Sequence, residues 1–194
     1  MKSSRLVAAV GLAGAFALTG ITAAQASPTP GADRLAVTAA ASQAEAQLVA
    51  QASRIDESFL RKVHQDSLFA IVNGGLAVHK GRCSTVRRLG GVEVRGHRQL
   101  DRSLRLVAAR ERVAIPSTLT RAQQKSLREL ARKSGTSFDR AWLRVQVVAH
   151  QQTLKLIQRQ LRSGQMVEVK QLAREAAPII RRHLDLARQA MRVC

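Results

Sequence analysis

Three of the five histidines have the same setting in the sequence. His97, His150 and His183 each lie near the middle of an apolar stripe with helical spacing. Imidazole nitrogen is a ligand that suits zinc, copper, nickel and iron ions. Three such rings meeting in a helical core would form a transition-metal site. The alternative is three core histidines that are satisfied by backbone groups, by water or by each other.

Carboxylates could add to such a site. Glu93 precedes His97 by four residues and so lies on the same helical face. Asp66 or His64, on an earlier helical segment, would reach the same level. The sequence requires no cofactor, and a divalent transition metal is the class that these side chains would accept.

A carboxylate-bridged di-iron site is not predicted. Such a site needs Glu-x-x-His on two helices and a Glu on each of the other two. The residues three positions before the histidines are Val94, Val147 and Ile180. No Gly-x-Ser-x-Gly elbow, phosphate loop or Cys-x-x-Cys motif is present either. We therefore predict no catalytic residues and favour a non-catalytic role.

The strong basic balance points to polyanionic partners. The chain has 32 Lys and Arg residues against 13 Asp and Glu residues. An anionic cell-wall polymer or an anionic membrane surface would be attracted to such a charge. Nucleic acid is disfavoured, because one Trp and no Tyr leave little aromatic surface for stacking on bases. Six arginines of one helical segment would form the anion-binding face, or alternatively an ordinary solvated face: Arg87, Arg88, Arg95, Arg98, Arg102 and Arg105.

Residues 1–26 have the features of a secretory signal peptide. Two basic residues come first, then an uncharged apolar run, then small residues at Ala24 and Ala26 before a polar stretch. The alternative is a retained membrane anchor, since the apolar run is about long enough to span a bilayer. Cleavage would leave 30 basic and 13 acidic residues, a formal charge of +17, and no further apolar span. We expect an exported protein, extracellular or associated with the cell wall.

The remaining sequence predicts an all-α domain. Residues 27–53 are rich in Ala, Ser and Pro, and this composition predicts a flexible leader. Residues 54–194 have helical periodicity and predict a helical bundle. Four long amphipathic segments and a short one suggest a four-helix bundle. The predicted helices cover residues 56–79, 84–112, 121–133, 136–162 and 165–193.

Capping patterns set several of these boundaries. Ser84 is the predicted cap of the second segment. Thr120 with Gln123 forms a capping box for the short helix, and Thr136 with Asp139 resembles a second box. Gly74-Gly75 predicts a close contact between helices, and Pro178 predicts a kink before His183.

The two cysteines constrain the topology. In an exported protein, an isolated pair such as Cys83 and Cys194 usually forms a disulfide. The alternative is two unpaired thiols. A simple up-down-up-down bundle would place these cysteines at opposite ends, about 40 Å apart. If residues 113–135 cross back along the bundle, the cysteines meet. This is ferritin-like connectivity, with the short helix as the crossover between helices two and three.

Several short elements are spread over about residues 56–192: Phe59-Leu60, Gly75-Leu76-Ala77, His97, Phe138-Asp139-x-x-Trp142-Leu143, His150, Pro178 and Arg182-His183-Leu184. With these elements the chain resembles the bacterial exported family called domain of unknown function 4142. The resemblance implies a ferritin-like helical bundle in the cell envelope with no established activity. The cysteine pair and the arginine-rich composition look like an actinobacterial branch of that family.

The chain departs from the pattern that the resemblance implies at three acidic positions. Asp-His is common in the family where this chain has Gly96-His97 and Ala149-His150, and a Glu is common at the position of Ala70. Loss of these carboxylates would weaken any metal function. We therefore expect first a non-catalytic bundle that binds an anionic envelope component, and second a metal-binding protein that uses the core histidines. No oligomeric state is predicted.

Overall fold

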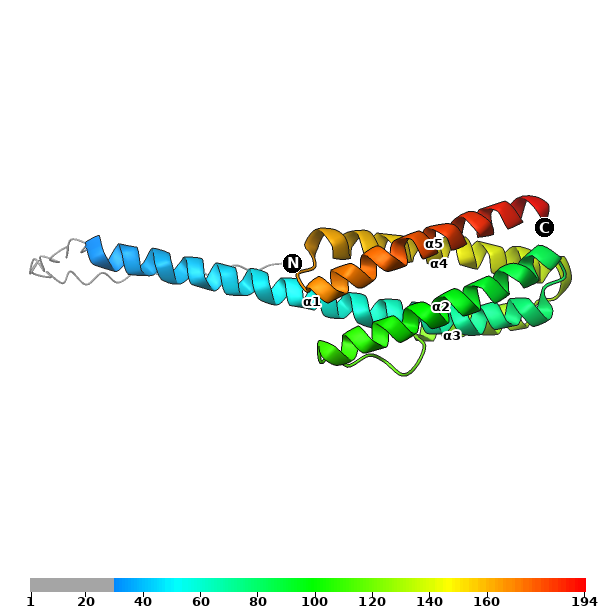
Figure 1. The fold of residues 1–194 in the computed structure, drawn as a ribbon, viewed down its shortest axis with the longest axis horizontal. Coiled ribbons are helices and arrows are strands. Elements are labelled where there is room, and N and C mark those ends of the chain that lie inside the picture. The colour runs from blue at the N-terminus through cyan, green and yellow to red at the C-terminus, as the bar shows by residue number, and fades with distance from the viewer. Residues whose placement is uncertain (1–29) are drawn as a thin grey trace, which may run out of the picture. The chain divides into compact units, whose positions relative to one another are not determined.

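The structure, a computed structural model, describes residues 30–194, and this part of the chain is helical without any strand. The all-α prediction is confirmed. The predicted signal peptide, residues 1–26, lies outside the described residues. The five helices are α1 (Pro30–Lys80), α2 (Ser84–Arg110), α3 (Arg121–Ala131), α4 (Gly135–Ser163) and α5 (Val167–Val193) (Figure 1).

The first helix begins earlier than predicted. The sequence suggested a flexible leader over residues 27–53 and a helix from about Asp56, whereas α1 is helical from Pro30. Alanine has the highest helix propensity, and proline is well tolerated in the first turn of a helix. The described side chains between Val37 and Ala50 are exposed, and burial begins at Asp56. For the described side chains of residues 37–50, local propensity and not packing therefore accounts for the helix.

Residues 41–194 form one compact unit, and its helices are arranged so that the α1–α2 turn and the end of α5 lie together. Figure 1 shows α2 running back along α1, a return through the segment that contains α3, and then α4 and α5 as an antiparallel pair. Helix α5 packs against both α4 and α2. The predicted pairing follows from this arrangement: Cys83 and Cys194 form a disulfide with their Cα atoms 5.9 Å apart.

The capping predictions had different outcomes. The Thr120–Gln123 box is confirmed, because the Thr120 hydroxyl accepts a hydrogen bond from Gln123 N and the Gln123 side chain accepts one from Thr120 N. The Thr136–Asp139 box is wrong, since α4 has Ser134 as its N-cap.

Asp139 instead caps a different helix. Its buried carboxylate accepts hydrogen bonds from the backbone N–H groups of Arg82, at 3.0 Å, and Cys83, at 2.8 Å. Cys83, not Ser84, is the N-cap of α2 and makes no side-chain cap. An acidic side chain from α4 thus satisfies the free donors ahead of α2 and holds the end of the unit that carries the disulfide.

The apolar core is divided into two clusters. One contains Leu104, Ile157 and Ile180, and the other, nearer the disulfide, contains Val86, Trp142 and Ala187. On each of α2, α4 and α5 the regular spacing of apolar residues is interrupted between these clusters by buried polar side chains. The three candidate histidines belong to this polar layer.

Two further predictions concern glycine and proline. The Gly74 prediction is confirmed: a Cβ atom there would lie 2.8 Å from the Gly90 carbonyl oxygen, so α1 and α2 approach closely. A Cβ atom at Gly75 would have no heavy atom within 4 Å, so Gly75 plays no part in the contact. Pro178 lies inside α5 and does not end it. None of the described helices is long and apolar enough to cross a membrane.

Candidate metal centre

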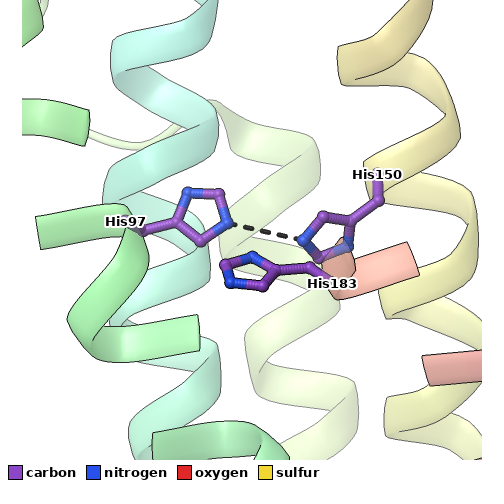
Figure 2. Close-up of side chains that lie close together, drawn as sticks. All are labelled: His97, His150 and His183. Carbon is purple, nitrogen blue, oxygen red and sulfur yellow. Dashed lines mark hydrogen bonds between the residues drawn. The ribbon is translucent and has the colours of Figure 1, made fainter. Parts of the chain in front are cut away.

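Helices α2, α4 and α5 bring the three histidines together. His97, His150 and His183 are buried, with 2 to 3% of each residue exposed. Their ring centroids lie 5.3 to 5.6 Å apart, and one ligand nitrogen of each lies within 4.8 Å of the others. Figure 2 shows the rings of His97 and His150 facing each other, with the His183 ring beside the gap between them. The predicted convergence is therefore present in the structure.

A short polar chain orients two of the rings. His150 Nδ1 donates a hydrogen bond to the backbone carbonyl of Gln146, at 2.8 Å, which leaves its Nε2 unprotonated. His97 Nε2 lies 3.4 Å from His150 Nε2, and His97 Nδ1 lies 3.5 Å from Ser67 Oγ. Two nitrogens bound to the same tetrahedral zinc ion would lie about 3.4 Å apart. The His97–His150 pair already has that spacing.

Gly96 makes room for the third ring. A Cβ atom at this position would lie 2.7 Å from Cε1 and 2.9 Å from Nε2 of His183. Any larger residue would displace the imidazole. His183 Nδ1 is buried and has no hydrogen-bond partner, so it is a nitrogen available to a ligand. The sequence predicted only a missing carboxylate at Gly96, and the close approach of His183 gives this residue a role.

Burial keeps all three imidazoles in the neutral form. The pKa of His97 is well below its ordinary value, because burial and the neighbouring rings disfavour its charged form. Burial lowers the pKa of His150 to about 4, partly opposed by the Gln146 carbonyl. Burial, His150 and Arg182 lower the pKa of His183 to about 4. At neutral pH each ring therefore has an unprotonated nitrogen, the form that binds metal.

Two buried polar side chains without partners lie one turn from the histidines along their helices, Glu93 on α2 and Gln146 on α4. Glu93 is fully buried, and neither of its carboxyl oxygens has a hydrogen bond. Burial raises the pKa of Glu93 well above its ordinary value. The Nε2 atom of Gln146, four residues before His150 on α4, also lacks a partner. Such groups are destabilising when nothing satisfies them.

Asp66 and His64, the two candidate residues on α1, have different surroundings in the structure. Asp66 lines a small cavity together with His97 and His150, and it accepts hydrogen bonds from Thr153 and Gln123. Burial raises the pKa of Asp66 to about 6, an effect only partly offset by these hydrogen bonds.

His64 points elsewhere. Its Nδ1 lies 2.6 Å from a carboxyl oxygen of Asp101 on α2, and it does not line the cavity. The predicted set of site residues did not include Gln146, which lines the cavity together with His97 and His150. The available signal was a polar residue on an apolar helical stripe, since Gln146 lies four residues before His150 on the same face.

The arginines of α2 lie apart from this centre. All six arginines of the predicted anion-binding face are exposed. Arg87 donates to the carbonyl oxygens of Gly81 and Arg82 in the turn between α1 and α2, which is a structural contact, and Arg88 donates to Thr85. None of the six forms an ion pair with a carboxylate in residues 30–194: Arg87, Arg88, Arg95, Arg98, Arg102 and Arg105.

The fold and site define an all-α protein with three histidines converging in its core. The chain belongs to the family described as domain of unknown function (DUF4142), whose model matches residues 23–190. The match begins well before residue 56, where the sequence resemblance was placed, and so it includes the whole segment predicted as a leader, residues 27–53. No curated protein and no solved structure shows a significant match to the chain.

Proposed function

We propose that this protein is an exported, ferritin-like four-helix bundle that binds a transition-metal ion through His97, His150 and His183. The observation that carries the proposal is the convergence of three buried imidazoles whose ligand atoms lie within 4.8 Å of one another. Three neutral nitrogen donors suit Zn²⁺, Cu²⁺ or Ni²⁺, with Cu²⁺ bound most tightly of the three.

The hydrogen bonds around the rings support this proposal. A metal-binding histidine typically donates its other ring N–H to a carbonyl or carboxylate, as His150 does to Gln146. To bind a metal ion through Nε2, His97 would carry its proton on Nδ1 instead. The Nδ1–H group could then donate a hydrogen bond to Ser67 Oγ. The ligand atoms would need to move closer by at most about 1.4 Å to reach tetrahedral spacing.

Glu93 supports the proposal through charge. A divalent cation among three neutral rings would put two positive charges in the core, which is unfavourable without an anion nearby. Glu93 lies one turn from His97 on the buried face of α2 and has no competing partner. Glu93 is not among the side chains whose ligand atoms converge, so in its ionised form it would offset part of that charge from one helical turn away.

Metal titration tests the proposal. We expect the metal-free protein to bind one equivalent of Zn²⁺, Cu²⁺ or Ni²⁺ by calorimetry, with confirmation by elemental analysis. Each of the variants His97→Gln, His150→Gln and His183→Gln should bind at least about 10-fold more weakly, the loss expected even for outer groups of a metal site. His79→Gln, at an exposed histidine of α1, is the matched control. Binding that is absent, or unchanged in the three core variants, would contradict the proposal.

A second candidate function rests on the arginine face of α2. Arg95, Arg98, Arg102 and Arg105 are exposed and have no ion-pair partner among the described carboxylates. Together with the basic balance of the chain, they suit an anionic wall polymer or membrane surface. This function would use the surface of the protein and is compatible with a metal in the core.

A further inference from the structure

A cleft of about 280 Å³ lies between α1 and α4, and three cationic side chains form part of its wall. Arg54 and Lys62 come from α1, and Arg159 comes from α4. All three residues are exposed, so the cleft is open to solvent. None of the three candidate metal ligands lines it, and a function of this cleft would therefore be additional to the proposed metal site.

The sequence places the polar groups of the cleft on one edge of α1. Arg54, Ser58 and Lys62 follow one another at intervals of four residues, so they lie on the same face of the helix. The two cations are about 12 Å apart along the helix axis, and Ser58 lies between them. Its hydroxyl group is a donor that can contact an anion held among the cations.

No carboxylate in residues 30–194 neutralises these cations. None of the three forms an ion pair, and no acidic residue lines the cleft. Asp56 is fully buried and is occupied by the side chain of Gln160 and by two backbone N–H groups ahead of α5. Asp66 is close enough to Lys62 for its pKa to be affected, but it is held by other side chains. A concave surface lined by charges of one sign concentrates counter-ions, so the cleft favours an anion.

The apolar part of the wall indicates that this anion is organic. Ile55 and Phe59 from α1 and Leu156 from α4 contribute it. A bare inorganic ion would leave these side chains in contact with water, whereas a short carbon chain would cover them. The volume of the cleft equals that of about nine molecules of liquid water, so a ligand would have roughly ten non-hydrogen atoms.

We propose that this cleft binds a small organic phosphate monoester. Its phosphate group, with nearly two negative charges at neutral pH, lies among the three cations, and its carbon chain lies on the apolar residues. The guanidinium groups of Arg54 and Arg159 match the geometry of phosphate oxygens, and Lys62 adds a point charge. The diester linkage of phospholipids and wall polymers carries only one negative charge and so uses fewer of these contacts.

Calorimetric titration of the metal-free protein with n-butyl phosphate tests this inference. We expect saturable binding of one molecule per chain at low ionic strength. Diethyl phosphate has the same number of non-hydrogen atoms but a single charge, and it should bind at least about 10-fold more weakly because it loses charge-assisted contacts. Inorganic phosphate should also bind at least about 10-fold more weakly, because burial of two methylene groups is enough for this difference.

A triple variant tests the position of the ligand. Replacement of Arg54, Lys62 and Arg159 with glutamine should weaken binding of n-butyl phosphate at least about 10-fold, since each lost charge-assisted contact is worth about that factor. These side chains are exposed, so the α-helical circular dichroism should be unchanged.

A second triple variant is the matched control. Replacement of Arg121, Arg132 and Lys133 with glutamine also removes two arginines and one lysine from exposed positions, and none of these residues lines the cleft. The two variants therefore have the same net charge. The control should bind n-butyl phosphate as the parent protein does.

Three results would overturn the inference. Equal weakening in both variants would show attraction by net charge alone. Equal or tighter binding of diethyl phosphate would assign the cleft to a diester, such as a lipid headgroup or a wall polymer unit. Equal binding of inorganic phosphate, or no saturable binding at all, would remove the organic ligand. Each of these results would leave the metal site untouched, because metal binding is measured separately and uses none of these residues.

Discussion

Single side chains in the polar layer determine whether the three imidazoles can meet. Gly96 illustrates this, because the edge of the His183 ring occupies the space that a Cβ atom would need. A glycine inside a helix normally destabilises it by about 1 kcal/mol relative to alanine. The glycine at this position thus lowers helix stability while making room for a candidate ligand.

Gly96→Ala should therefore weaken metal binding. The added methyl group would lie 2.7 Å from His183 Cε1, so the ring must move away from the other two. We expect at least a 10-fold loss of affinity for Zn²⁺ in calorimetry, with the α-helical circular dichroism unchanged.

Gly75→Ala is the matched control for this substitution. Its Cβ atom would have no neighbour within 4 Å, so metal affinity should be unchanged and the metal-free protein should be more stable by up to about 1 kcal/mol. Equal metal affinity in the Gly96 and Gly75 variants would contradict the role assigned to Gly96.

Glu93→Gln should stabilise the metal-free protein at neutral pH. Because burial raises the folded-state pKa of Glu93, the native protein binds one more proton than the unfolded chain above the ordinary value of 4.5. The contribution of Glu93 to the unfolding free energy of the parent protein therefore falls as pH rises. It falls by about 1.4 kcal/mol per pH unit until the folded-state pKa is reached. Denaturant unfolding at pH 4 and pH 7.5 should show a small difference at pH 4 and a clear advantage of the variant at pH 7.5.

Saturating Zn²⁺ should reduce the stability advantage of the Glu93→Gln variant over the parent protein. The parent protein can ionise Glu93 and so offset the charge of the bound ion, whereas the glutamine variant cannot. Zn²⁺ should therefore raise the unfolding free energy of the parent protein more than that of the variant. An equal gain in both proteins would show that Glu93 has no part in balancing the metal charge.

At the scale of the helices, much could be predicted because the relevant signals are local. Thr120 and Gln123 form a box within four residues, so the sequence contains both partners. The meeting of the histidines was predictable because each lies at a similar distance along its helix from the cysteine end, once the helix directions were set.

Signals that cross between helices could not be assigned in advance. Asp139 has the spacing of a cap for its own helix but caps α2, and only the packing of α4 against the α1–α2 turn reveals this. His64 and Asp66 are two residues apart and so point about 200° apart on a helix. The sequence could not decide which of them faces the histidines, because the contact of His64 with Asp101 is made between helices.

The disulfide joins two of these elements, and its removal should reduce stability. Cys83 and Cys194 are 111 residues apart in sequence, and closing a loop of that length contributes about 4 to 5 kcal/mol on the chain-entropy model. The double variant Cys83→Ser with Cys194→Ser should lose about that much unfolding free energy in urea.

Metal binding by the folded double variant should persist. The histidines lie about 16 to 21 Å along their helices from the cysteines, so the bond does not hold the rings directly. Reductant should destabilise the parent protein by a similar amount and leave the double variant unaffected. Free thiols on both cysteines of the protein purified without reductant would contradict this prediction.

For the molecule as a whole, a basic surface surrounds a core that holds neutral, unprotonated rings. The two features are independent, since the histidines are buried and the arginines of α2 are exposed. Binding of polyanions should therefore depend strongly on salt, while binding of metal in the core should depend on it weakly. This difference allows the two candidate functions to be tested separately in the same protein.

The location of the arginines provides the sharper test of the surface function. Replacing Arg95, Arg98, Arg102 and Arg105 with glutamine removes four charges from one face of α2. The matched control removes four exposed charges near the start of α4 instead, and these are Arg132, Lys133, Arg140 and Arg144. Both proteins have the same net charge, so they differ only in the place from which charge was removed.

On immobilised polyphosphate, we expect the α2 variant to elute at clearly lower salt than the control variant. A contiguous cationic face binds several phosphates at once, and the salt dependence of binding decreases with every phosphate that is no longer neutralised. Equal elution of the two variants would mean that retention reflects net charge alone and that α2 has no dedicated face. Because neither set includes a histidine, Zn²⁺ affinity should be the same in both, which checks that the core is intact.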